Sequence, residues 1–307
     1  MSTGRISSQS RLDQGGAATA TTQPMERDRW PAYAVLSGWG ITTVGGSDAR
    51  SWLHDLVTAD VEGLPDRGSR RCLLLTPTGR IRADLHIAAV DGSYLLLQAP
   101  DQPERVAVIL RPYVLSSDVQ MVDVSNSSEV VAVLDGSVVE AGPESVVLSP
   151  SVVGPGSDVV VPSGDASARL LDRLRASGLT EADAGDLEAR RIRRGEPRMG
   201  VDFGQDALPA EAGLEDTIDF TKGCFLGQES VAKVRNLGHP PRVLLHVRSE
   251  APIAPGARVV AGATVVGEVT SAVEEADGAA AIVRVRWDAA SEQLATDAGP
   301  LSLQRVE

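Results

Sequence analysis

A chain of 307 residues with 42% hydrophobic side chains is long enough for two domains and can bury a core. Its formal net charge of −13 argues against direct binding to nucleic acid or to an anionic membrane surface. Its apolar runs fall well short of the ~20 residues of a membrane helix, so we expect no membrane partner. Two cysteines far apart in sequence, Cys72 and Cys224, do not form a disulfide framework and favour a cytoplasmic location.

Residues 1–29 are rich in small and polar side chains and lack hydrophobic periodicity, which predicts a disordered tail. Arg5 and Arg11 also give this segment a weak transit-peptide character. A strand is predicted at 39–46, followed by a helix at 47–57 with Ser47 as its N-cap.

Asp91-Gly92 between two apolar runs predicts a hairpin turn. A second helix is expected at 102–115, capped by Asp101, and a third at 166–177. Strands separated by these helices indicate an α+β architecture built from two similar halves, since the pattern does not alternate as in a parallel doubly wound sheet.

The last part of the chain has short β-like runs separated by Pro-Gly and Asp-Gly, after a linker at 236–242. This pattern predicts a small β-barrel or sandwich. We therefore expect an α+β domain at 30–235 and a C-terminal barrel domain at 236–307.

The segment 180–198 begins with acidic residues and ends with arginines. Thr180 and Asp183 fit a capping box, and Gly195 and Pro197 would end the helix. The charge gradient complements the helix dipole, but arginines at a helix end also suit the carboxylates of an anionic ligand. Both interpretations stay open.

On a strand at 79–90, Arg82, Asp84 and His86 share one face. A solvated face is the simpler interpretation, because an Asp next to a His is a weak signal for acid–base chemistry.

The segment KGCFLGQE places Cys224 between Lys222 and the start of a helix, with Glu229 in the first turn. Helix N–H groups and the lysine would favour a thiolate, whereas an inert cysteine in a strand-to-helix turn is the alternative. The cysteines and histidines have no metal-ligand spacing, so we predict no resident metal.

The segment TKGCFLGQE (221–229) resembles the signature of the YgfZ-type folate-binding proteins, relatives of the glycine-cleavage T-protein, an aminomethyltransferase. Weaker similarity extends over roughly residues 33–300. The resemblance implies a ring of two ferredoxin-like lobes and a C-terminal β-barrel around a cavity that binds tetrahydrofolate. It also implies a role in assembly or repair of iron–sulfur enzymes, with client or assembly proteins as partners and an effect on tRNA modification through such clients.

The resemblance implies a reactive thiol at Cys224 near the mouth of the cavity, with Lys222 lowering its pKa. It implies that the following residues contact or order the ligand site: Asp84, Gly223, Gly227, Gln228 and Glu229. One departure concerns Arg193, which stands in RIRRG where T-protein-like sequences carry a pterin-recognising glutamate. A guanidinium has no acceptor, so we expect Arg193 to contact a ligand carboxylate instead.

Two other functions stay open. One is a true tetrahydrofolate-dependent aminomethyltransferase, against which Arg193 argues. The other is a folate-binding scaffold that catalyses no reaction, in which Cys224 would be an ordinary thiol.

Overall fold

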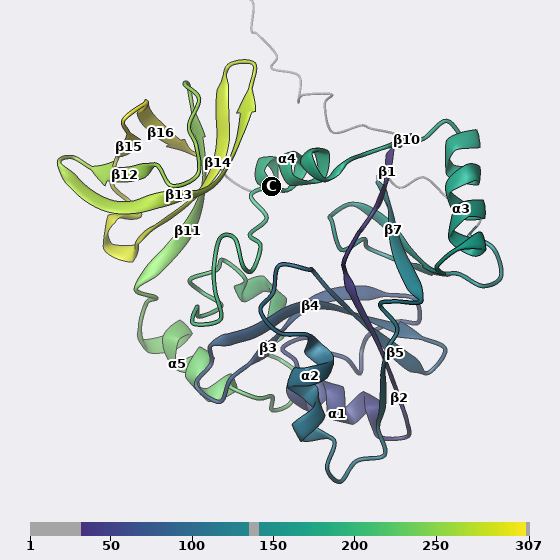
Figure 1. The fold of residues 1–307 in the computed structure, drawn as a ribbon. Coiled ribbons are helices and arrows are strands. Elements are labelled where there is room, and N and C mark those ends of the chain that lie inside the picture. Colours follow the sequence, from purple (N-terminus) through teal and green to yellow (C-terminus); the bar gives the residue numbers. More distant parts are fainter. Residues whose placement is uncertain (1–31, 135–140, 305–307) are drawn as a thin grey trace, which may run out of the picture.

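The computed structural model describes residues 32–134 and 141–304, and the tail predicted at 1–29 lies outside them. The described residues form two α+β lobes and a closed β-barrel (Figure 1). Helix α4 (Ala184–Arg193) lies between the barrel and the second lobe, and α5 (Gln228–Leu237) lies between the barrel and the first lobe. The three parts thus form a ring, and the predicted α+β class with a C-terminal barrel is confirmed.

The first lobe is a five-stranded sheet in the order β3-β4-β5-β2-β6. Its core joins Trp52 and Leu53 of one helix to Val106 of another. The predicted hairpin turn is present, and both Asp91 and Gly92 have positive φ. The elements are β2 (Gly40–Gly45), α1 (Ala49–Leu56), β3 (Ser69–Leu75), β4 (Ile81–Val90), β5 (Ser93–Gln98), α2 (Val106–Leu110), the 3-10 helix η2 (Arg111–Tyr113) and β6 (Gln120–Asp123).

The second lobe is a five-stranded sheet in the order β10-β1-β7-β9-β8. Strand β1 pairs antiparallel with β7 and parallel with β10, so the first strand of the described residues belongs to the second lobe. Leu170 and Leu174 of α3 pack on this sheet. The elements are β1 (Ala32–Val35), β7 (Ser128–Leu134), β8 (Val146–Leu148), β9 (Gly156–Pro162), α3 (Asp165–Ala176) and β10 (Thr180–Glu181).

The C-terminal strands close into a barrel in the order β11-β14-β13-β12-β15-β16, which decides between the barrel and the sandwich. Alternate residues such as Val269, Ala281 and Val283 fill its interior. The predicted domain boundary at 236 falls inside α5, which continues to Leu237. The boundary therefore stays a prediction. The elements after α4 are η3 (Glu215–Thr217), α5, β11 (Arg242–Ser249), β12 (Arg258–Ala261), β13 (Thr264–Glu275), β14 (Gly278–Arg286), η4 (Trp287–Ala289), β15 (Leu294–Thr296) and β16 (Gly299–Leu303).

The helix predicted at 47–57 is present, but its capping was predicted wrongly. Asp48 is the N-cap residue, and its side chain makes no capping hydrogen bond. The hydroxyl of Ser47 instead donates to Asp118, with an oxygen–oxygen distance of 2.8 Å. Ser47 therefore ties the start of the helix to the loop before β6.

The helix predicted at 102–115 is much shorter, because α2 begins only after Arg105. The side chain of Gln102 accepts from the backbone N–H of Asp84, at 3.0 Å, and so binds the adjacent strand. Asp101 was predicted as the cap, but its carboxylate lies 3.4 Å from Nε of Arg198.

The capping box predicted from Thr180 to Asp183 is displaced along the chain. Thr180 lies in β10, because it pairs with β1 at the edge of the second sheet. The box forms between Asp183 and Asp186, at distances of 2.9 and 3.0 Å, and α4 follows it.

Candidate functional site

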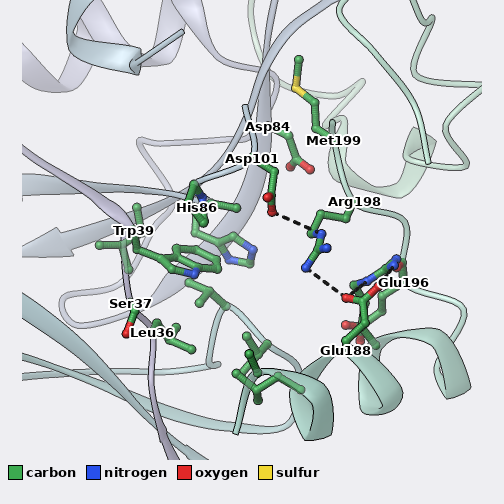
Figure 2. Close-up of a pocket in the computed structure, with 18 of the residues that line it drawn as sticks. Leu36, Ser37, Trp39, Asp84, His86, Asp101, Glu188, Glu196, Arg198 and Met199 are labelled. Atoms are coloured by element: carbon green, nitrogen blue, oxygen red, sulfur yellow. Dashed lines mark hydrogen bonds and ion pairs between the residues drawn. The ribbon is translucent and has the colours of Figure 1, made fainter. Parts of the chain in front are cut away.

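A cavity of about 430 Å³ lies between the two lobes (Figure 2). Its walls come from the end of β1 and the turn after it, strands β3 to β5, the loop after β8, and α4 with the segment that follows. Sites for drug-sized organic ligands span roughly 300–1,000 Å³, so the cavity has the size of a small-molecule site.

One wall of the cavity is apolar. It is formed by Leu36, Trp39, Leu97, Val152 and Leu187, contributed by both lobes. Such a wall suits a flat or aliphatic part of a ligand, because it removes apolar surface from water.

An ion pair forms a charged part of the lining, on the same sheet as Leu97. Arg71 on β3 donates to both carboxylate oxygens of Asp84 on β4, at 2.9 and 2.6 Å, and also to the carbonyl of Pro197. Burial acts to lower the pKa of Arg71, but the charge and hydrogen bonds of Asp84 outweigh it and raise that pKa. Asp84 is 8% exposed. The pair is therefore a fixed, charged part of the wall.

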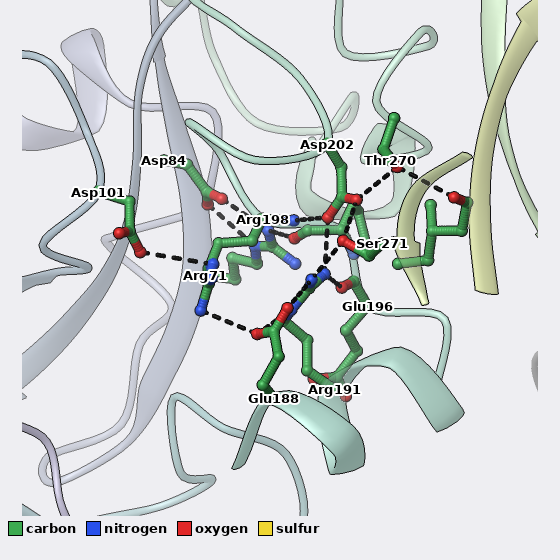
Figure 3. A network of polar contacts seen from close by, with 12 residues as sticks. Arg71, Asp84, Asp101, Glu188, Arg191, Glu196, Arg198, Asp202, Thr270 and Ser271 are labelled. Carbon is green, nitrogen blue, oxygen red and sulfur yellow. Dashed lines mark hydrogen bonds and ion pairs between the residues drawn. The ribbon is translucent and has the colours of Figure 1, made fainter. Parts of the chain in front are cut away.

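A second network begins at Arg191 of α4 (Figure 3). Its guanidinium donates to Glu188, at 2.6 and 3.0 Å, and to the fully buried Asp202, at 2.6 Å. Asp202 also accepts from the hydroxyls of Thr270 and Ser271, at 2.6 and 2.7 Å. A bulge in β13 lies at these two residues, and it allows both neighbours to reach one carboxylate. The network joins the cavity wall to the barrel.

Arg198 spans one side of the cavity. It lies 3.0 Å from Glu188 of α4 and 3.4 Å from Asp101 of the first lobe (Figure 2). The side chain thus bridges the two lobes across the cavity wall.

His86 of β4 also lines the cavity. Burial, with the nearby charge of Arg71, lowers the pKa of its imidazole to about 3, against a smaller opposing effect of Asp84. Its Nδ1 is buried without a hydrogen-bond partner among the residues that the structure describes. The imidazole is therefore neutral at physiological pH.

The cysteine segment lies against the end of α1, outside the lining of this cavity. Nζ of Lys222 donates to the carbonyls of Val57, at 2.7 Å, and Ala59, at 3.1 Å, and also to that of His54. Burial lowers the pKa of Lys222. Cys224 is exposed, and it is not among the residues that line the cavity.

Gly227 sets the turn between the cysteine and α5. It is the N-cap residue with φ of +84°, and a β-carbon there would lie 2.5 Å from the carbonyl oxygen of Thr76. This close approach requires glycine, because a side chain would clash with backbone. Gln228 and Glu229 form the first turn of α5, as predicted.

No family model matches the chain. It is 25% identical to a putative chloroplastic transferase of Arabidopsis thaliana, over 77% of the chain and 60% of the relative. It is 26% identical to the tRNA-modifying protein YgfZ of Photobacterium profundum, over 73% of each. It is 28% identical to a mitochondrial iron–sulfur cluster assembly factor IBA57 homolog of Mycosarcoma maydis, over 73% of the chain and 58% of the relative. The chain thus spans less than two thirds of the length of the Arabidopsis and Mycosarcoma relatives.

The fold has a solved counterpart. Aminomethyltransferase T of the Bartonella henselae glycine cleavage system superposes with a TM-score of 0.77 at 19% identity, over 90% of this chain and 85% of that one. The chain is thus similar in sequence to YgfZ-type proteins and to aminomethyltransferases. At 19% identity the superposition shows the fold alone, and the activity has to be argued from the site.

Among the predicted ligand-site residues, Asp84 is the one that lines the cavity. Arg193 points elsewhere: its Nε donates to the buried Glu275 of the barrel, at 3.0 Å. The expectation that Arg193 contacts a ligand carboxylate is therefore not supported. Gly223 and Gly227 lie in the cysteine segment outside the cavity lining, together with Gln228 and Glu229.

Sequence reasoning missed several cavity residues: Trp39, Arg71, Glu188, Arg191 and Arg198. The arginine-rich end of 180–198 was a signal for two of them, but which arginines face the cavity depends on the position of α4. Trp39 and Arg71 carried no sequence signal of their own.

The described residues contain no cluster of three or more potential metal ligands. They also include no helix long and apolar enough to cross a bilayer.

Proposed function

We propose that this protein binds tetrahydrofolate in the cavity between the lobes and acts as an accessory protein in assembly or repair of iron–sulfur enzymes. The observation that carries the proposal is the cavity itself, whose lining combines apolar side chains and an indole with guanidinium and carboxylate groups. Two relatives bear names that speak of iron–sulfur cluster assembly and of tRNA modification, which supports this direction.

The chemistry of the cavity suits the parts of a folate. A flat ring would pack on Trp39 and Leu97, where apolar surface is available. Arg198 would attract the glutamate carboxylates, because the donors of Arg191 already have partners within the protein. The residue change at Arg193 does not alter the cavity lining, because Arg193 pairs with Glu275 of the barrel and is not among the lining residues.

Cys224 would be the reactive group of the protein. Its thiol is exposed on a segment held against α1 by Lys222 and by the N–H of Leu226, which donates to the carbonyl of Asp55 at 3.1 Å. An exposed thiol on a fixed segment can exchange with a partner protein or transiently bind a metal. The partners would be iron–sulfur clients or assembly proteins.

The test is complementation of cells that lack their own YgfZ-type protein, scored by the activity of an iron–sulfur enzyme. Cys224→Ala should abolish rescue, and Lys233→Ala, an exposed lysine on α5, should leave it unchanged. Full rescue by Cys224→Ala would show that the function does not require the thiol.

A tetrahydrofolate-dependent aminomethyltransferase is the second candidate, favoured by the solved relative. Against it, Asp84 is held by Arg71 through two hydrogen bonds and is not a free base. An assay with aminomethyl-lipoyl carrier protein decides: robust formation of methylenetetrahydrofolate would reverse this ranking. The cytoplasmic location also stays a prediction, since relatives have chloroplastic and mitochondrial names.

A further inference from the structure

The charged groups that line the cavity are already paired within the protein. Arg71 holds Asp84, and Arg191 and Arg198 both hold Glu188. A ligand gains little specificity from groups that already satisfy one another, because it must compete with a partner in place.

Gln102 is engaged as well. Its amide accepts from the backbone of Asp84 and bonds the side chain of Gln98, at 3.0 and 3.2 Å. The imidazole of His86 differs, because neither a hydrogen bond nor an ion pair links it to another described residue, whereas Arg198, whose Nε also lacks a hydrogen bond, is held by two ion pairs. Buried polar groups in folded proteins are nearly always paired, so an imidazole that lines the cavity without any hydrogen bond is the lining group that gains most from a ligand.

The position of His86 suits an uncharged ring. In the sheet it lies opposite Leu97 on one side and Arg71 on the other. The same cavity is lined by Trp39 and Leu36. A neutral imidazole offers one donor and one acceptor nitrogen, and a pterin ring carries both kinds of group along its edge.

We propose that His86 recognises the ring of the bound ligand by a hydrogen bond from its imidazole, and so determines which heterocycles the cavity accepts. This inference rests on the proposed folate site. It assigns the ring to the end of the cavity near Trp39 and His86, and the carboxylates to the end near Arg191 and Arg198.

The test uses anaerobic titration calorimetry with two probes: tetrahydrofolate, and a reduced pterin without the aminobenzoyl-glutamate tail. The proteins are wild type, His86→Leu, His86→Asn and the control His239→Leu, whose ring is stacked on Trp287 of the barrel. Thermal unfolding verifies that each variant folds. The Asn variant keeps a polar amide near Nδ1, in case Leu is not tolerated.

We expect His86→Leu to bind both probes about tenfold more weakly, His86→Asn to stay within about threefold of wild type, and His239→Leu to match it. If His86→Leu binds both probes as tightly as wild type, the assignment of His86 to the ring is wrong, but the proposed folate site stands. The same holds if His86→Leu weakens binding of tetrahydrofolate and not of the reduced pterin. Wild-type protein that binds neither probe would overturn the proposed function and the assignment with it.

Discussion

The two cysteines have opposite environments. Cys72 lies fully buried in the core of the first lobe, where burial, followed by the charge of Asp84, raises the pKa of its thiol. Cys224 is exposed on the docked segment. Reactivity toward alkylating agents requires both access and a thiolate, so the two residues should be separable in one experiment.

Alkylation of the folded protein should therefore add one label, at Cys224, and unfolding should release the second thiol. Intact-mass measurement with peptide mapping counts and locates the labels. Rapid labelling of Cys72 in the folded state would contradict the buried core described for the first lobe.

The lowered pKa of His86 predicts how the stability of the protein changes with pH. Its pKa of about 3 in the folded protein lies below the ordinary value of 6.5, so the unfolded chain takes up a proton first as pH falls. The stability due to neutral His86 is therefore present above pH 6.5 and is lost between 6.5 and 3. Relative to His86→Gln, wild type should lose on the order of 2 kcal/mol by pH 4.5, measured by urea unfolding. A difference that does not change with pH would contradict a neutral imidazole.

Among the elements, the contact between the cysteine segment and α1 was not visible in the sequence. Lys222 was predicted to act on the neighbouring thiol, but its ammonium binds the carbonyls at the end of α1. Free carbonyls at a helix C-terminus attract cations, so this contact has a structural explanation. Whether Lys222 also affects Cys224 stays a prediction.

The chain's second lysine in this region provides a matched control. Lys222→Met should destabilise the protein by about 1–3 kcal/mol, because it leaves partly buried carbonyls without a donor. Lys233→Met, on the exposed face of α5, should change the unfolding free energy by less than about 0.5 kcal/mol. Equal stability of the two variants would indicate that Lys222 acts on the thiol and not on the fold.

For the whole molecule, local patterns predicted the class of fold and the segments that matter. The alternation of 79–90 brings Asp84 and His86 to one face, and the glycine turn of Gly227 starts a helix as expected. The relation between these segments could not be predicted, because it depends on tertiary packing: Phe225 and the cavity-lining Met199 share one core cluster, while Cys224 lies outside the lining. Trp39 and Arg71 reach the cavity only through that packing.

The central claim is that the ligand cavity and the thiol are two sites. Calorimetric titration with tetrahydrofolate tests it with a matched tryptophan pair, since Trp39 lines the cavity and Trp287 is exposed on the barrel. We predict that Trp287→Ala and Cys224→Ala bind as wild type does, and that Trp39→Ala binds about tenfold more weakly or worse. Normal binding by Trp39→Ala, or loss of binding in Cys224→Ala, would contradict the account.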